Sequence, residues 1–173
     1  MKRNDFLREL SGGDRRSIGK SENVVSEVLA DARLFAPLFD CMLAGDPLVR
    51  MRAADAVEKI TALRPEFLRP FKAKLINRVA GINQREVRWH AAQLFPRLEL
   101  NKAERDKVIR ILKGYLQDES KIVKTFSMQA LGDLAMQDAR LRPSVIKELE
   151  ALTKDGSAAM KSRGVRLLAR LKK

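Results

Sequence analysis

The sequence contains few of the side chains on which metal sites, disulfides and aromatic pockets depend. Its 173 residues include one cysteine, one histidine, one tryptophan and one tyrosine. Cys41 therefore has no partner for an internal disulfide, and we expect it to be buried as a small apolar side chain. Since His90 is the sole histidine, a site of several histidines is excluded. We expect no catalytic residues, no metal and no cofactor, and we classify the chain as a non-enzyme.

Long apolar runs are also missing. No stretch approaches the roughly 18 consecutive apolar residues that a membrane-spanning helix requires, because charged residues recur every few positions. Residues 1–10 are too charged to contain the apolar centre of a signal peptide. Together with the single cysteine, these features predict a cytoplasmic protein without a membrane span.

Positive charge is in excess. The chain has 35 Lys and Arg against 22 Asp and Glu, and its net charge is +13. The surplus lies in residues 41–98, with eleven basic against five acidic residues, and in residues 137–173, with ten against four. Such a surplus raises the expectation of an anionic partner, but a basic helix face that only contacts water is the default interpretation.

A segment of twelve residues occurs four times. The copies begin at Val49, Val87, Val123 and Met160, with spacings of 38, 36 and 37 residues. Apolar residues at relative positions 1, 8, 9 and 12 lie on one face of a helix. Position 5 always carries a small residue, namely Ala53, Ala91, Ser127 and Gly164. A small side chain at this position lets a neighbouring helix approach closely.

A second amphipathic stretch precedes each copy, so each repeat is predicted to be a helical hairpin. Prolines lie near the starts of these stretches, where a missing backbone N–H is tolerated, and Asn101 is placed to cap one of them. No run alternates with period two for long enough to predict a strand. The expected hairpins span residues 32–63, 65–98, 101–136 and 138–171. A degenerate hairpin, with Ser21 as a helix cap, precedes residue 32.

Two domains of different character follow from this organisation. Residues 1–20 are expected to be a basic, partly mobile segment that includes a short helix. Residues 21–173 are expected to form the repeat domain.

The segment from Asp46 to Val57 resembles the second helix of HEAT repeats. It contains the Asp-Pro, Val-Arg and Ala-Ala pairs of that family, and the resemblance covers about residues 32–171. It implies an all-α fold, specifically a right-handed α-solenoid of about four to five helical hairpins.

The same resemblance implies a repeat-stacking role for polar residues of the second helices. These are Asp46, Arg50, Arg88, Lys124 and Lys161. The second position of the repeated segment is basic in all four copies. Gln84, Ser120 and Ser157 replace the aspartate in the later copies. An Asp-to-Arg ladder along the whole chain is therefore not expected.

A glycine-rich stretch from Gly13 to Ser21 is similar to a phosphate-binding loop. Five residues separate Gly13 from Gly19, whereas the motif requires four, and no predicted strand precedes it. Nucleotide hydrolysis is therefore disfavoured.

The leading functional hypothesis is a scaffold that binds an unknown protein partner through the second helices. Trp89, His90 and Phe126 are the candidate anchors, because aromatic residues on such surfaces dominate interface energetics. His90 is expected to be a partly exposed residue on the helix surface.

Two alternatives involve nucleic acid. Basic residues on the polar face of the second helices predict a DNA or RNA backbone binder without sequence specificity. They are Arg52, Lys59, Arg97, Arg163, Arg166 and Arg170. A remoter resemblance is to the HEAT-like alkylpurine DNA glycosylases, for which Asp55 and Asp133 are the available carboxylates. Holding a flipped base requires more aromatic surface than this chain offers.

Overall fold

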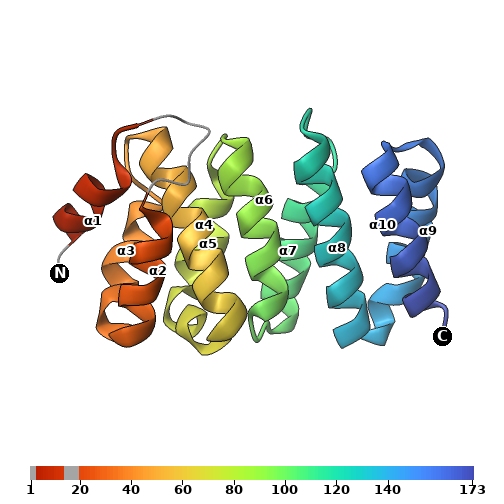
Figure 1. Ribbon diagram of the computed structural model, residues 1–173. Coiled ribbons are helices and arrows are strands. Elements are labelled where there is room, and N and C mark those ends of the chain that lie inside the picture. The colour runs from red at the N-terminus through yellow and green to blue at the C-terminus, as the bar shows by residue number, and fades with distance from the viewer. Residues whose placement is uncertain (1–2, 14–19) are drawn as a thin grey trace. The chain divides into compact units, whose positions relative to one another are not determined.

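The computed structural model describes residues 3–13 and 20–173, and all regular structure in these residues is helical (Figure 1). Most of the stretch similar to a phosphate-binding loop, residues 14–19, lies outside the described residues. The chain divides into two compact units, Met1–Glu99 and Leu100–Lys173.

The first unit contains six α-helices among its described residues. They are α1 (Arg3–Leu10), α2 (Ser21–Ala30), α3 (Phe35–Cys41), α4 (Pro47–Leu63), α5 (Lys72–Asn77) and α6 (Arg85–Leu94). Short 3₁₀ helices connect or extend them: η1 (Ala32–Leu34), η2 (Pro65–Phe71), η3 (Val79–Gly81) and η4 (Phe95–Arg97). The first half of the hairpin expected at 65–98 is therefore less regular than its amphipathic pattern suggested, since Pro70 lies inside η2 and cannot donate a helical hydrogen bond.

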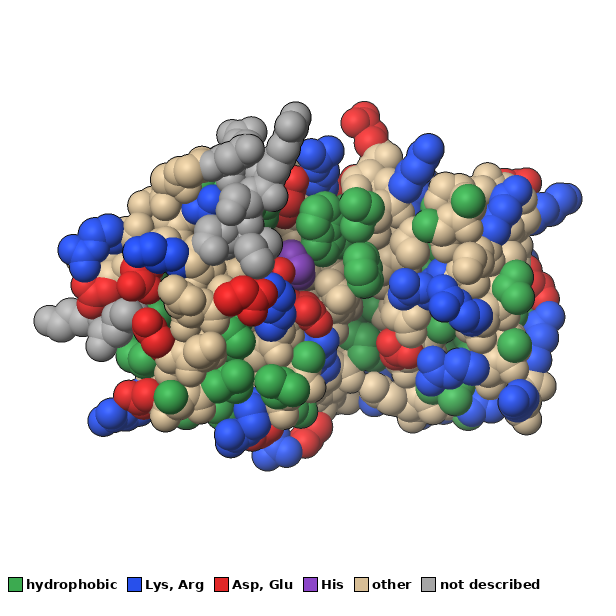
Figure 2. Space-filling view, in the orientation of Figure 1, with side chains coloured by type: hydrophobic (Ala, Val, Ile, Leu, Met, Phe, Trp, Pro, Cys, Tyr) green, Lys and Arg blue, Asp and Glu red, His purple; other side chains and the backbone are tan. Residues whose placement is uncertain are grey.

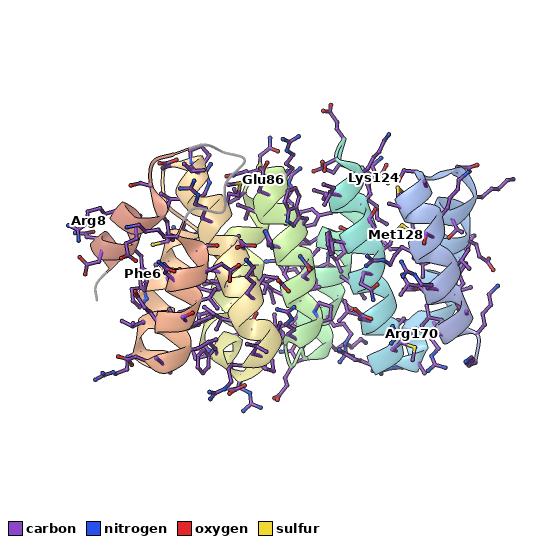
Figure 3. All side chains as sticks on the ribbon, viewed as in Figure 1. Phe6, Arg8, Glu86, Lys124, Met128 and Arg170 are labelled. Atoms are coloured by element: carbon purple, nitrogen blue, oxygen red, sulfur yellow. The ribbon has the colours of Figure 1, made fainter. Side chains whose placement is uncertain are left out.

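In the first unit, neighbouring second helices pack against one another: α2 contacts α4, and α4 contacts α6. Helix α1 packs against α3 and α4, and Phe6 is fully buried at this contact (Figure 3). Phe35, Phe39 and Phe71 form an aromatic cluster, with the rings of Phe39 and Phe71 4.6 Å apart. Cys41, the last residue of α3, is buried, as predicted for a small apolar side chain.

The second unit contains α7 (Lys102–Tyr115), α8 (Lys121–Gln137), η5 (Ala139–Leu141), α9 (Arg142–Asp155) and α10 (Ala158–Leu171). Helix α8 packs against α7, α9 and α10, and α9 packs along α10. Asn101 caps α7 as predicted: its side chain accepts a hydrogen bond from the Glu104 N–H, and the Glu104 carboxylate accepts one from the Asn101 N–H, both at 2.9 Å.

The four copies of the repeated segment occupy equivalent positions in their helices. Val49, Val87, Val123 and Met160 all lie in the first turn of a second helix, and all are buried. The four small residues at position 5 are buried as well. The helical period therefore identified the buried face of each second helix.

Two of the three residues that replace Asp46 in the later copies still cap their helix, whereas Gln84 makes no side-chain cap at the start of α6. Asp46 caps α4 by accepting a hydrogen bond from the Leu48 N–H at 2.8 Å. Ser120 and Ser157 cap α8 and α10 with their hydroxyl oxygens. Serine satisfies the free N–H groups of a helix start about as well as aspartate does. The substitution at two of the four copies thus keeps the cap and removes only the charge.

Candidate functional site

Side chains of α2, α4 and η4 in the first unit form two groups of polar and ionic contacts. The Ser21 hydroxyl donates a hydrogen bond to Asp55 at 2.9 Å, and the Lys59 ammonium lies 2.9 Å from the same carboxylate. Lys59 also pairs with Glu22 of α2. Burial by itself would lower the pKa of Lys59, but its hydrogen bonds to Glu22 and Asp55 outweigh this effect and raise the pKa above its usual value. Lys59 is thus held as a cation between two helices.

Arg97 makes a second bridge in this unit. Its guanidinium pairs with the Glu58 carboxylate, and it also donates to the Glu58 carbonyl oxygen at 2.6 Å and to the Thr61 hydroxyl at 2.8 Å. The side chains of Arg97 and Glu58 are both about four-fifths buried, at 21% and 18% exposure. We term the set Ser21, Glu22, Asp55, Glu58, Lys59, Thr61 and Arg97 the first-unit bridge network.

Arg52 does not lie on this open face, so the prediction that it is exposed there is wrong. Its side chain is 2% exposed and donates to the carbonyl oxygens of Leu10 and Gly12, at 2.9 and 2.6 Å. Leu10 is the last residue of α1, where backbone carbonyls have no helical partner and attract positive charge. Arg52 therefore fastens the end of α1 to α4.

His90 is also more buried than expected. It is 9% exposed, which contradicts the prediction of a partly exposed surface residue. Burial lowers the pKa of His90 to about 4, although the carboxylates of Asp55 and Glu58 act in the opposite direction. Within the described residues its Nδ1 atom has no hydrogen-bond partner. The imidazole ring lies 5.6 Å from the ring of Trp89, which is only half-buried.

The second unit presents a separate group on α8 and α10. The Arg163 guanidinium lies 5.7 Å from the centre of the Phe126 ring and donates to Gln129 at 2.9 Å. Gln129 donates in turn to Asp133, and Arg170 lies 3.8 Å from that carboxylate. We term Phe126, Gln129, Asp133, Arg163 and Arg170 the second-unit bridge network. Its aromatic ring is half-buried and held beside a cation.

The three predicted anchors therefore lie in two environments. Trp89 and His90 belong to the first unit, and Phe126 belongs to the second. Trp89 and Phe126 are each partly accessible, whereas His90 is buried.

The residues predicted to stack neighbouring repeats differ in their contacts and exposure. Arg50 donates to the Gln84 side chain at 2.8 Å and to the carbonyl oxygens of Ala44 and Gly45. Gln84 donates to the Pro47 carbonyl, so these residues join α4 to the start of α6. Asp46 acts as a cap, as described above. Arg88 and Lys124 are half-buried, and Lys161 is exposed.

Several partners in these bridges were not identified from the sequence, although a signal for them exists. Polar contacts between neighbouring hairpins join residues that are 33 to 39 positions apart, about one repeat. Examples are Glu22 with Lys59 and Glu58 with Arg97. Opposite charges about one repeat length apart would have indicated these pairs. Similarity between equivalent positions of the repeats does not reveal which residues at different positions have complementary charges.

The second unit also contains a cleft of about 600 Å³ between the start of α8, the last turns of α9 and the start of α10. Its charged lining is mixed: Lys121 and Lys124 face Glu119, Glu148 and Asp155. Within residues 3–13 and 20–173, no group of three His, Cys, Asp or Glu side chains could hold a metal ion. In the same ranges, no helix combines the length and apolar character needed to cross a membrane.

Comparison with known proteins identifies a similar fold. No family model matches the chain, and no curated protein matches it. The crystal structure of an engineered protein from the Northeast Structural Genomics Consortium superimposes with a TM-score of 0.69 and 18% identity, over 96% of this chain and 79% of that one. The fold is all-helical. At this level of identity the similarity supports no statement about function.

Proposed function

We propose that this chain is a HEAT-type repeat protein, a right-handed α-solenoid of about four to five hairpins, which binds a protein segment without catalysing a reaction. Four equivalent second helices with matching buried columns support the repeat interpretation. Polar contacts at one repeat length support it further, because adjacent repeats in such a protein contact mainly their neighbours.

The observation that carries the binding hypothesis is the contrast between Trp89 and the charges on the same face. Lys59 and Arg97 are neutralised by Glu22, Asp55 and Glu58 within the first unit. The face therefore offers little free positive charge to a phosphate backbone. Trp89 remains partly accessible, and the centre of its ring lies 5.6 Å from that of the buried His90. A rigid aromatic side chain within a satisfied polar surround is typical of a protein-binding hot spot.

Trp89 also provides the test, because it is the only tryptophan and its fluorescence reports on its own surroundings. The intact protein would be used to select binders from a displayed random-peptide library, and the selected peptides would then be titrated. We expect them to shift the Trp89 emission. We also expect them to bind Trp89→Ala about tenfold or more weakly, the loss typical of a hot-spot residue.

Two further variants make the experiment specific. Trp89→Phe keeps an aromatic ring and should retain most of the affinity, and Leu63→Ala alters an exposed apolar residue of α4 and should have no effect. Circular dichroism would verify that each variant is folded. Peptides that bind Trp89→Ala as tightly as the unmodified protein would contradict the proposal.

Binding of a nucleic-acid backbone is the second candidate, and the observation that favours it is confined to the second unit. Arg166 is exposed and has no ionic partner among the described residues, in contrast to Lys59 and Arg97. A mixed-sequence DNA duplex titrated at two salt concentrations would test this candidate. Phosphate binding requires the logarithm of the affinity to fall with the logarithm of salt concentration, with a slope of about 0.9 per phosphate neutralised. An affinity independent of salt would exclude it.

A further inference from the structure

The outward face of α10 carries an exposed strip of three apolar residues and one serine. Ala158, Ser162, Val165 and Ala169 all keep at least part of the side chain accessible, and their spacing of four, three and four residues places them on one side of the helix. Val165, at the centre of this strip, is 61% exposed. We term these four residues the α10 strip.

The position of Val165 is buried in every other copy of the repeat. Val165 corresponds to Ala54 of α4, Ala92 of α6 and Met128 of α8, and each of these three side chains is fully buried. Met128, for example, lies in the interior of the second unit (Figure 3). The same column thus serves as a helix-packing surface three times and is open only on α10.

Positive charge surrounds the α10 strip. The segment from Gly156 to Lys173 contains no acidic residue and six basic ones: Lys161, Arg163, Arg166, Arg170, Lys172 and Lys173. Figure 2 shows Lys and Arg side chains gathered over this part of the molecule. Arg163 and Arg170 are engaged with α8, and Lys172 pairs with Glu150 at 2.6 Å. Lys161 and Arg166 lie on either side of the strip, and neither has an ionic partner within the described part of the chain.

We propose that the outward face of α10 binds an acidic amphipathic helix from a protein partner. The small residues of the strip allow a helix axis to approach to about 8–10 Å, and Val165 then packs against the apolar side of the incoming helix. Carboxylates flanking that apolar side pair with Lys161 and Arg166, which fixes the orientation of the bound helix. This surface differs from the one around Trp89, so each proposal can fail without the other.

The apolar strip distinguishes a helical partner from nucleic acid. A phosphate backbone would gain from Lys161 and Arg166 but would leave Val165 in water. A helix satisfies both, because its carboxylates pair with the cations and its apolar side removes Val165 from water.

The test uses synthetic helical peptides as defined probes. One peptide carries a leucine and alanine face with glutamate on both flanks. A second has the same composition in scrambled order, and a third carries lysine on the flanks in place of glutamate. Binding to the full chain would be followed by the fluorescence anisotropy of a labelled peptide. We expect the first peptide to bind at least about tenfold more tightly than either of the other two.

Two variants test separate parts of the surface. Val165→Glu places a carboxylate in the strip, and Lys161→Glu combined with Arg166→Glu reverses the flanking charge. Each should weaken binding of the acidic amphipathic peptide about tenfold or more. All three side chains are exposed, so the fold should be retained. Leu63→Glu, at a residue of α4 that is 67% exposed, is the matched control and should leave the affinity unchanged.

Several results would overturn the proposal. They are equal binding of the scrambled or lysine-flanked peptide, and unchanged affinity in Val165→Glu. Binding of a mixed-sequence DNA duplex that displaces the peptide and survives Val165→Glu would assign the surface to nucleic acid. Concentration-dependent self-association that Val165→Glu abolishes would assign it to a second copy of this chain.

Discussion

Gly164 lies where α9 and α10 approach each other closely, and replacing it by alanine is a stringent test of the packing. A Cβ atom at this position would lie 1.8 Å from the Thr153 hydroxyl oxygen and 3.0 Å from the Thr153 Cβ. Threonine is stiff about χ1, and this hydroxyl donates to the Leu149 carbonyl oxygen at 2.5 Å. The Gly164→Ala variant can therefore be accommodated only if the two helices separate or Thr153 gives up its hydrogen bond.

Two opposing effects determine how much Gly164→Ala changes the free energy of unfolding. Overpacking of a well-packed contact costs about 1–3 kcal/mol, and the 1.8 Å approach places this site near the upper end. Alanine recovers about 1 kcal/mol of helix propensity relative to glycine. We expect Gly164→Ala to lower the free energy of unfolding by about 2 kcal/mol. Gly114→Ala in α7 is the matched control, because its new methyl carbon would meet nothing within 4 Å among the described residues beyond its chain neighbours and the adjacent backbone of α7. It should raise that free energy by up to about 1 kcal/mol.

Urea unfolding followed by far-ultraviolet circular dichroism would measure both variants. Combining Thr153→Ala with Gly164→Ala removes the hydroxyl, so the double variant should lose less than the sum of the two single changes, with a coupling of about 1 kcal/mol or more. If Gly164→Ala is stabilised as much as Gly114→Ala, the close approach of α9 and α10 is refuted.

Three further predictions concern charged or titratable groups. Burial holds the pKa of His90 at about 4, below its ordinary 6.5, so the folded state binds fewer protons than the unfolded one. The contribution of His90 to stability should be complete above pH 6.5, and the free energy of unfolding should fall by up to about 3 kcal/mol as the pH drops toward 4. Replacing His90 with phenylalanine should remove this dependence in thermal unfolding. Hydrogen bonding to Arg140 lowers the pKa of Asp138 from 3.8 to about 2. The stabilising contribution of Asp138 should therefore be present above pH 4 and disappear as the pH falls toward 2. The Asp138→Asn variant should lack this contribution already at neutral pH. Arg52→Ala should destabilise the fold by about 1–3 kcal/mol and accelerate hydrogen exchange in residues 3–10.

Each of these has a result that would contradict it. An NMR titration that places the His90 pKa at 6.5 or above would reject its buried environment. An Asp138→Asn variant with the same acid unfolding curve as the unmodified protein would show that its pairing with Arg140 and Arg105 contributes nothing. Unchanged exchange rates in residues 3–10 of Arg52→Ala would show that this arginine does not fasten α1.

The sequence predicted the helical class and the buried columns because both follow from local periodicity. Val49 and its three equivalents are buried in every copy, and Asn101 forms the expected cap. Periodicity states which side of a helix faces its neighbours. It does not state where a long side chain ends, and this is why Arg52 was misplaced: its guanidinium reaches carbonyls that are 40 and 42 residues away.

The candidate site was predicted less well, for a related reason. Comparing equivalent positions of the four copies suggested that Lys59 and Arg97 are free cations. Each instead pairs with a carboxylate from the preceding repeat. His90 was judged from the arginines at the same position of other copies, but one of them, Arg52, is itself buried, so residue type at this position does not indicate exposure. Aromatic residues on a helix face were easier to locate, and Trp89 and Phe126 are both partly accessible.

The one-repeat separation of the polar bridges has a consequence for how the chain acquires its structure. Closing a loop of some 40 residues loses only modest entropy, and each doubling of loop length would add only about 0.6 kcal/mol. Within each unit, a hairpin can therefore pack against the next one as soon as that hairpin has been synthesised, before distant parts of the chain are made. Folding that relies on such local contacts is expected to be fast, and damage to one hairpin should spread first to the hairpins beside it.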